Sequence, residues 1–425
     1  MEKILTSTEK VREFQIKIYQ KAKSEPKFRF YALYDKLYRK DVLDESWRRV
    51  KANKGGAGID GKTIEDIEKE GVEQLLSGIE KELKELSYKP SSLKRVEIPK
   101  ADGRKRPLSI PTVKDRVVQM ALKLVIEPIF EADFEKNSYG YRPGKGTHDA
   151  VNEVKKNVYL GWTQVIEVDI ENCFGTIPHK ELLERVARRI VDRKILWLVN
   201  MFLKADVMGA GRKDDDRIGT PQGGVISPLL ANIYLDQIDK AWRKFQKYAR
   251  MIRYADDIVI LTKQYAEGNK RVLEKIVKSL KLKTNAKKTK ITNAEEEKFD
   301  FLGFSFRRAT SQLTKEKMAY FWPSKKSVKK AMDKVKEIAS IYRMEKVDEI
   351  VKQLNPVMRG WVNYFRVSNG SKQLNKVKDY TADKVRKYMK RKAGVKGYGF
   401  GKYTDEFLYE KLGLYGDYKV RWMNA

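Results

Sequence analysis

Cysteine and histidine are nearly absent from this sequence of 425 residues, which contains one cysteine, Cys173, and two histidines, His148 and His179. A disulfide framework is therefore excluded, and a Cys/His zinc site cannot be assembled within one chain. The scarcity also argues against Cys–His and Ser–His–Asp catalysis and against a nuclease domain built on histidine-bound metal. Any metal ion must be held mainly by oxygen ligands, which favours Mg²⁺ or Mn²⁺. We interpret both histidines as structural.

Long apolar runs and acidic residues are also scarce. No run of about 18 apolar residues could span a membrane, and the first residues, MEKILTSTEK, are polar rather than typical of a signal peptide. Acidic residues number 58 against 90 lysines and arginines, which gives a formal net charge of +32. So large a surplus repels itself in the folded chain and indicates a polyanionic partner. Nucleic acid is the first candidate, and an anionic membrane surface is the rival.

Hydrophobic residues make up 41% of the chain, which is enough for buried cores, and the length suggests two or three structural units. Alternating apolar residues predict strands at 93–99 and 163–170 and two more within 250–262, with helices between them. From Ser324 onward the pattern becomes helical, with 25 basic and 11 acidic residues. We therefore expect a domain boundary near 310–323.

Two of the predicted strands deliver aspartates at their ends. The segment MIRYADDIVIL places Asp256 and Asp257 between two apolar runs, as at the tip of a tight hairpin, and VIEVDI carries Asp169. Carboxylates at the ends of buried strands need a compensating charge, usually a divalent cation. Strands laid side by side would bring Asp169 beside Asp256, where two Mg²⁺ roughly 3.5–4 Å apart could carry out nucleotidyl transfer. Taken singly, these aspartates could instead be a solvated turn and a helix cap.

The chain resembles the group II intron reverse transcriptases, or maturases, from about residue 45 to about residue 370. Nine blocks in order carry the resemblance: NKGGAGIDG, VEIPKADGRKRPLSIPTVKDRVVQMAL, SYGYRPGKGTHDAV, VIEVDIENCFGTIPH, GTPQGGVISPLLANIYLD, IRYADDIVIL, KKTKI, FDFLGFSF and LNPVMRGWVNYF. It implies an α+β right-hand polymerase, with fingers and palm of antiparallel sheet plus helices followed by an all-helical thumb. On this basis we expect an N-terminal helical extension (1–45), fingers and palm (46–315), a thumb or maturase domain X (316–400) and a basic C-terminal tail (401–425).

The resemblance implies an RNA-directed DNA polymerase (reverse transcriptase) that copies intron RNA into cDNA and binds that RNA to assist splicing. The expected cofactor is Mg²⁺, as two ions, with Mn²⁺ able to substitute. The expected partners are group II intron RNA, an RNA template with a DNA or RNA primer, dNTPs and target DNA, and no membrane. We expect a cytoplasmic, nucleoid-associated bacterial enzyme. It is similar to the endonuclease-lacking subset, which would prime from existing 3′ ends or nascent strands.

The resemblance also assigns roles to single residues. Asp169, Asp256 and Asp257 match the catalytic triad and, with the backbone carbonyl of Ile170, the metal site. Residues implied to bind the dNTP are Lys100 and Arg106 on a basic hairpin tip, Ile170, Gln222, and Phe174 as an aromatic gate against a 2′-hydroxyl. Those implied to bind nucleic acid are Lys54, Arg142, the Leu302-Gly303 turn that would grip the primer, and the thumb cations Lys325, Lys326, Lys329, Lys330, Lys387, Lys390 and Arg391.

Other readings stay open from the sequence. Lys100 and Arg106 could be solvated turn charges, Phe174 could be an ordinary core residue, and the Pro-Gln-Gly-Gly run could be a plain turn into a helix. The chain could also be a domesticated relative in host DNA repair or phage defence, a splicing factor with a dead polymerase site, or an RNA-dependent RNA polymerase. The three aspartates disfavour a dead site, and Phe174 disfavours an RNA polymerase. Cys173 and Gly175, on either side of Phe174, depart from the common family pattern.

Overall fold

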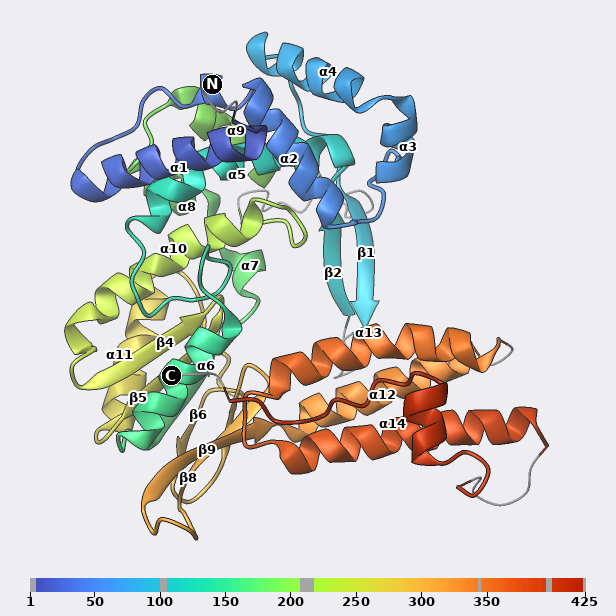
Figure 1. The fold of residues 1–425 in the computed structure, drawn as a ribbon. Coiled ribbons are helices and arrows are strands. Elements are labelled where there is room, and N and C mark those ends of the chain that lie inside the picture. The colour runs from blue at the N-terminus through green and yellow to red at the C-terminus, as the bar shows by residue number, and fades with distance from the viewer. Residues whose placement is uncertain (1–4, 100–104, 207–217, 343–344, 395–399, 423–425) are drawn as a thin grey trace.

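The computed structural model describes residues 5–99, 105–206, 218–342, 345–394 and 400–422 (Figure 1). A helical unit, two small antiparallel sheets and a projecting hairpin precede a unit of three long helices. This mixture of helices and antiparallel sheets, followed by an all-helical part, confirms the predicted α+β class. No helix among the described residues is both long and apolar enough to cross a lipid bilayer.

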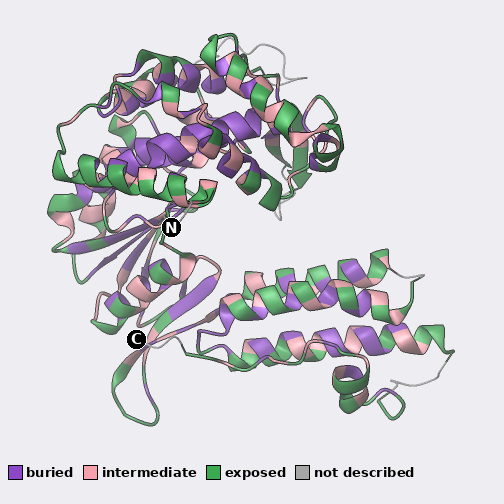
Figure 2. Ribbon diagram, turned by 45° about the horizontal axis from the view of Figure 1, so that its top comes forward, coloured by how far each residue is buried: buried purple, intermediate pink, exposed green. Residues whose placement is uncertain are grey.

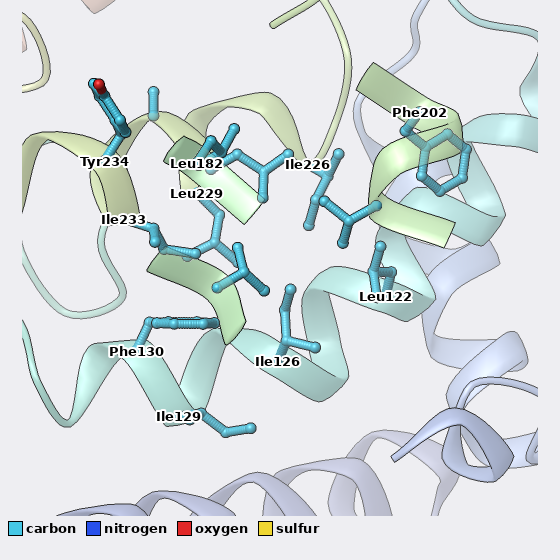
Figure 3. Packing of buried hydrophobic residues seen from close by; sticks show 14 of the residues in the cluster. Leu122, Ile126, Ile129, Phe130, Leu182, Phe202, Ile226, Leu229, Ile233 and Tyr234 are labelled. Atoms are coloured by element: carbon cyan, nitrogen blue, oxygen red, sulfur yellow. The ribbon is translucent and has the colours of Figure 1, made fainter. Parts of the chain in front are cut away.

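The helical unit is built around α5 (Val113–Glu131), most of whose residues are buried. The helix begins where the Thr112 side chain accepts a hydrogen bond from the Asp115 backbone. In Figure 3 its Leu122, Ile126 and Phe130 lie among apolar side chains of three neighbouring helices. The other helices of the unit are α1 (Ser7–Ser24), α2 (Lys40–Ala52), α3 (Ile64–Glu70), α4 (Val72–Lys84), α8 (His179–Ala187), α9 (Arg193–Leu203) and α10 (Ser227–Trp242), with short turns η1 (Tyr34–Lys36) and η2 (Arg243–Phe245).

The expected boundary between an N-terminal extension and the rest falls inside a helix. Residue 45 lies in the middle of α2, and both α1 and α2 contact α5. Glu45 itself is buried, and it accepts hydrogen bonds from Thr8, Arg48 and Arg49. The first two helices are therefore part of the helical unit rather than a separate extension.

A two-stranded hairpin projects from the helical unit toward the three long helices (Figure 1). Its strands are β1 (Lys94–Pro99) and β2 (Lys105–Ile110), paired antiparallel from Lys94↔Ile110 to Pro99↔Lys105. Five of the six residues of β1 are exposed, so the hairpin is held at its base rather than along a buried face.

The central sheet has four antiparallel strands in the order β4-β5-β3-β6. They are β3 (Gln164–Asp169), β4 (Ala249–Tyr254), β5 (Asp257–Thr262) and β6 (Lys290–Asn293). Alternate residues face opposite ways, as strand geometry requires. Ile166 and Ile260 join the core with α10 and α11 (Ala266–Ser279), whereas Val165 and Leu261 pack with α6 (Thr147–Tyr159). Both faces of this sheet are thus covered, which fixes its register.

A second sheet of three strands connects the central sheet to the long helices. It contains β7 (Phe299–Phe301), β8 (Phe304–Thr310) and β9 (Lys317–Pro323), and Phe306 stacks between Phe299 and Phe321. β8 and β9 pair over seven residues, from Phe304↔Pro323 to Thr310↔Lys317. The expected boundary at 315–316 therefore falls within a sheet, and the helical part begins at Lys325.

The three long helices are α12 (Lys325–Ile341), α13 (Val347–Phe365) and α14 (Ser371–Lys392). Buried residues form stripes along the sides of these helices that face one another (Figure 2). A Cβ on Gly370, just before α14, would lie 2.5 Å from Pro323, just before α12. Helices α12 and α14 thus begin at the same end and run in the same direction. Helix α13 runs the opposite way and connects the end of α12 to the start of α14 (Figure 1).

The expectation of a basic C-terminal tail is wrong. Residues 401–425 contain four basic and four acidic residues, so the segment carries no net charge. Its described part returns along the long helices (Figure 1) and includes the short helix η3 (Phe407–Lys411). Leu408, Leu414 and Tyr418 are buried with them, and Asp417 pairs with Arg366 at 2.9 Å. The segment therefore covers part of the helical core.

Candidate active site

The three aspartates lie at one end of the central sheet. The two-residue turn Ala255-Asp256 joins β4 to β5, with Tyr254 paired to Asp257. Across β5, Asp169 is the register partner of Asp257. The turn needs a φ of 56° at Ala255, and a positive φ at this position matches hairpin turns to strand twist. The fold thus brings together carboxylates that are 87 residues apart in sequence.

The carboxylates repel one another. Desolvation, together with the negative charges of Asp256 and Asp169, raises the pKa of Asp257 to about 6, although Lys288 and Lys326 act the other way. Burial and then the charge of Asp256 raise the pKa of the Cys173 thiol to about 12. Such mutual repulsion is what a bound divalent cation would relieve, so this donor set fits Mg²⁺.

The site leaves part of any metal's coordination to other groups. Within the described ranges, no three or more His, Cys, Asp or Glu side chains are gathered so as to hold an ion. Mg²⁺ is commonly held by one or two carboxylates, with water and substrate phosphates completing the shell. Ile170, whose carbonyl is a candidate ligand, directly follows Asp169. It is buried, and its backbone pairs with Thr284. The Asp169–Asp256 pair with this carbonyl is compatible with that pattern.

Lys288 contributes to the site without having been predicted to do so. Its Nζ lies 3.0 Å from Asp169 Oδ2, with about half of its side chain exposed at 53%. The backbone of Asn285 also donates to the Asp169 carbonyl, at 2.8 Å. The block KKTKI, which contains Lys288, was the available sequence signal, but sequence alone does not show which of its three lysines faces Asp169.

Arg253 supports the turn from below and was also missed. Its side chain is fully buried, ion-paired with Asp239 at 2.5 Å, and donates to Asn232 Oδ1 at 3.0 Å and to the Ala255 carbonyl at 2.9 Å. Asn232 in turn donates to the Gly140 carbonyl at 2.7 Å. A Cβ on Gly140 would stand 2.4 Å from Ala255 N, so only glycine permits this approach. The signal was present as an arginine inside an otherwise apolar strand and polar residues inside an apolar helix.

Phe174 lies on the short helix α7 (Cys173–Thr176), directly after the Asp169 strand, and is half-buried. The Thr220 backbone donates to its carbonyl at 2.6 Å, which ties α7 to the Gly-Thr-Pro-Gln-Gly-Gly loop. The departure at Gly175 has a steric reason: a Cβ there would stand 2.3 Å from Asn172 Nδ2. A Cβ on Gly219 would likewise lie 3.1 Å from the Gly175 carbonyl. The two glycines allow α7 and this loop to meet.

The same loop holds the base of the projecting hairpin. Ser109 in β2 donates its N–H to the Gln222 carbonyl at 2.6 Å, and a Cβ on Gly223 would meet the Ser109 carbonyl at 2.7 Å. Gln222 is thereby placed between the hairpin and α10. Arg106 pairs with Ile98 through its backbone, and Lys100 lies outside the described residues.

Leu302 and Gly303 form the tight turn between β7 and β8, with φ of 49° and 83° and Phe301 paired to Phe304. Positive φ at both positions is the type I′ hairpin pattern. Tyr364 donates through its hydroxyl to the Leu302 carbonyl at 2.9 Å, and Ser327 to the Gly303 carbonyl at 2.8 Å. The turn is thus bound to both α12 and α13.

Comparison with known proteins identifies the family to which the chain belongs. The family model for reverse transcriptase (RNA-dependent DNA polymerase) matches residues 98–306, and the group II intron maturase-specific domain matches residues 328–402. Protein YkfC of Escherichia coli (strain K12) is 32% identical over 363 residues, which cover 75% of this chain and 93% of YkfC. The chain belongs to the reverse transcriptases that carry a group II intron maturase domain.

Intron-encoded proteins match over shorter parts of their length. The group II intron-encoded protein LtrA of Lactococcus lactis is 36% identical over 214 residues, 50% of this chain and 35% of LtrA. An uncharacterized 91 kDa protein in a cob intron of Schizosaccharomyces pombe is 29% identical over 63% of this chain and 40% of its own length. The chain therefore spans less than half of these two relatives. A partial Cas6-RT-Cas1–Cas2 complex covers 59% of this chain and 42% of that chain, at 23% identity and a TM-score of 0.34, which is too low to bear on the fold.

In this reverse transcriptase the thumb is formed by α12, α13 and α14, and its predicted cations form two groups. Lys325, Lys326, Lys329 and Lys330 are exposed on the first turns of α12, near the palm. Lys387, Lys390 and Arg391 lie near the end of α14, and Lys390 is half-buried. Because both helices begin at the same end, a rise of 1.5 Å per residue separates the groups by roughly 20–25 Å.

Two other basic residues of the reverse transcriptase differ in what they can contact. Lys54 is exposed at the start of the glycine-rich loop, with a φ of 45°. Arg142 is buried, ion-paired with Glu131 at 2.5 Å and bonded to the Ser138 carbonyl at 2.8 Å. Its donors are directed into the protein, so a contact with nucleic acid is not supported and we do not propose one. Its charge alone suggested a phosphate contact, whereas its acidic partner Glu131 is evident only from the fold.

Proposed function

We propose that this reverse transcriptase copies group II intron RNA into cDNA and binds the same RNA to assist its splicing. The observation that supports it most directly is the meeting of Asp169, Asp256 and Asp257 at one end of the palm sheet. The maturase-specific match over the thumb adds an RNA-binding role to the polymerase site. Similarity to an intron-encoded protein supports intron RNA as the template.

The proposed metal ligands are Asp169, Asp256 and the Ile170 carbonyl, with Asp257 beside them. Two Mg²⁺ ions bound there, or Mn²⁺ in their place, would activate the primer 3′-hydroxyl and neutralise the triphosphate. The protein's own contribution is position: strand pairing places Asp169, and the tight turn places Asp256. Lys288 supplies a positive charge to Asp169 at 3.0 Å, which offsets part of the repulsion within the cluster.

The substrates would be bound by groups around these aspartates. Phe174 would lie under the deoxyribose and exclude a 2′-hydroxyl, and Gln222 would line the nucleotide pocket. Lys100 and Arg106 would close over the triphosphate, because paired or multiple cations recognise phosphates well. The Leu302-Gly303 turn would hold the primer end, Lys54 the template, and the thumb cations the phosphates of the template–primer duplex.

The proposed partners are group II intron RNA, a DNA or RNA primer on an RNA template, and target DNA. A net charge of +32 suits all of these, since each is a polyanion. We also propose a cytoplasmic, nucleoid-associated location, where such DNA targets lie.

The proposal is tested with one protein preparation and two readouts. A group II intron transcript is incubated with the chain in low Mg²⁺, and spliced RNA and primed cDNA are both measured. We expect the wild type to raise both, and Asp256→Asn to raise splicing alone. If the wild type makes cDNA but leaves splicing unchanged, the maturase role fails; if it makes no cDNA, the polymerase role fails. Replacing dNTPs with NTPs should abolish extension if Phe174 acts as the gate.

A further inference from the structure

The end of the palm sheet opposite the aspartates carries exposed aromatic rings among cations. Tyr248 precedes β4 and is 67% exposed, and Tyr265 follows β5 and is 83% exposed. Trp162, just before β3, is half-buried, with the Arg250 guanidinium 5.1 Å and the Lys263 Nζ 5.5 Å from its ring centroid. We call these residues, with Lys247, the distal aromatic–basic surface.

Backbone pairing brings the three segments together. Thr262, at the end of β5, is the register partner of both Gln164 in β3 and Ala249 in β4. Its hydroxyl donates to the Gln264 carbonyl at 2.5 Å and to the Tyr248 carbonyl at 3.3 Å. The turns that carry Trp162, Tyr248 and Tyr265 therefore lie at the same end of the sheet. Five residues of extended strand separate this end from Asp257, about 17 Å at 3.4 Å per residue.

The charge of this surface has one sign. The segments 159–163, 247–250 and 262–266 contain no aspartate or glutamate. Glu267, in the first turn of α11, is the nearest acidic residue in sequence. The segment after β6 lies beside Thr163 and carries Glu295, which is paired with Arg308 and Lys317, followed by the exposed Glu296 and Glu297. Lys247, Arg250 and Lys263 are all exposed. The surface thus offers cations without a carboxylate in the same turns.

We propose that the distal aromatic–basic surface binds single-stranded nucleic acid at a site separate from the polymerase centre. Exposed rings stack on unpaired bases, and interleaved lysines and arginines contact the phosphates between them. A duplex would use the cations but leave the rings without stacking partners, so unpaired nucleotides match the whole set of side chains better. The proposal does not depend on polymerase or splicing activity, because it concerns binding alone.

The test measures binding after the proposed template–primer site has been filled. The full chain is saturated with an unlabelled template–primer duplex, and the affinity of a fluorescein-labelled 12-nucleotide uridine RNA is then measured by anisotropy. We expect Tyr265→Ala and Tyr248→Ala each to weaken binding roughly tenfold, the scale of one lost base–ring stack. Tyr31→Ala removes an equally exposed ring, at 71%, from the helical unit and should leave binding unchanged. Equal effects of the three variants would overturn the proposal.

Further probes distinguish the kind of ligand. If the tyrosine variants also bind a 12-nucleotide thymidine DNA more weakly, the surface accepts either kind of single strand. If only RNA binding is weakened, the surface is specific for RNA. Both results support the proposal. If the tyrosine variants lose binding only to a blunt RNA duplex, or only to a peptide of aspartates and glutamates, the proposal is overturned. Lys247→Ala with Lys263→Ala should lower the salt slope of single-strand binding by about 0.7 per lysine. A 4-thiouridine RNA should crosslink to the three turns, and crosslinks found only around Asp169 and Asp256 would contradict the assignment.

Discussion

At the scale of single residues, the turn that carries Asp256 depends on a buried charge beneath it. Arg253 has no exposed surface, yet it carries a full charge whose partner is Asp239. Burying a charge without its partner is costly, while a paired one fixes geometry through its directional bonds. One of those bonds reaches the carbonyl of Ala255, the residue before Asp256. We infer that Arg253 and Asp239 are positioning residues for the turn.

Replacing Asp239 should therefore destabilise the protein strongly. Asp239→Asn keeps the size of the side chain but leaves the Arg253 charge buried and unpaired, at a cost of about 3 kcal/mol. The matched control is Glu80→Gln, which breaks the exposed pair with Lys84 at 2.5 Å and should cost well under 1 kcal/mol. Urea unfolding of the variants measures both values, and equal small losses would contradict the role given to Arg253.

The sequence could predict which aspartates meet, but not what holds them. Asp169, Asp256 and Asp257 stand at the ends of apolar strands, and strand ends in one sheet gather at an edge. Arg253, Asp239 and Asn232 lie on segments whose long-range pairing sequence alone does not reveal. The prediction that Arg142 binds nucleic acid failed for the same reason, since its partner Glu131 is identified only by the fold.

At the scale of elements, close backbone contacts join α7 to its neighbours. Asn172 has a φ of 44°, and its side chain fills the space beside Gly175. A Cβ on Gly219 would lie 3.1 Å from the Gly175 carbonyl oxygen and 3.2 Å from its Cα. A side chain at position 175 therefore requires the Asn172 side chain to move or to be replaced.

We predict that Gly175→Ala lowers polymerase activity by displacing Phe174, because the new methyl group would stand 2.3 Å from Asn172 Nδ2. Asn172→Gly suits the positive φ and removes the clashing group, so the double variant should regain most of the lost activity. Steady-state incorporation of one dNTP measures each variant. Additive losses in the double variant would show that the two positions do not share this space.

The junction of α1 and α2 provides a pH-dependent test. Hydrogen bonds from Arg48, and also from Arg49 and Thr8, lower the pKa of Glu45 to about 2, although desolvation opposes them. A folded-state pKa below the unfolded one stabilises the protein above about pH 4.5, and this stabilisation is lost as the pH falls toward 2. Glu45→Gln should cost about 2 kcal/mol at pH 7 and less at pH 4. Urea unfolding at the two values checks it; a cost independent of pH would contradict it.

At the scale of the whole molecule, charge is distributed unevenly. The segment from Ser324 onward, with 25 basic and 11 acidic residues, contributes 14 of the net +32 charges. All of this surplus precedes residue 401, because residues 401–425 are balanced. The cations of α12 and α14 lie at opposite ends of the thumb, a separation that suits contacts with phosphates along a duplex rather than at one point. Composition predicted the partner class, but the distance between the two groups depends on the fold.

Template–primer binding should accordingly depend on salt and on these lysines. The double variant Lys329→Ala/Lys330→Ala should weaken binding and reduce the slope of log K against log salt by about 1 per lysine. Lys69→Ala/Lys81→Ala removes two exposed lysines from α3 and α4 and serves as the charge-matched control. A filter-binding titration at several salt concentrations measures the slopes, and identical slopes for both doubles would remove α12 from the binding surface.

The domain limits were the least predictable large-scale feature. Periodicity places helices and strands, but a limit depends on which elements pack together. Thus α2 runs across residue 45, and β9 pairs with β8 beyond residue 316. Residues 401–425 belong to the thumb rather than to a separate tail, because Leu408, Leu414 and Tyr418 pack on helices that lie earlier in the sequence.

Primer extension tests the central claim most directly. The purified chain is given an RNA template, a DNA primer, dNTPs and Mg²⁺, and is compared with Asp256→Asn and with Asp35→Asn, an aspartate of η1 remote from the palm turn. We predict full-length cDNA from the wild type and from Asp35→Asn, and none above background from Asp256→Asn when all three are equally folded. Equal extension by Asp256→Asn, or none by the wild type, would contradict the account.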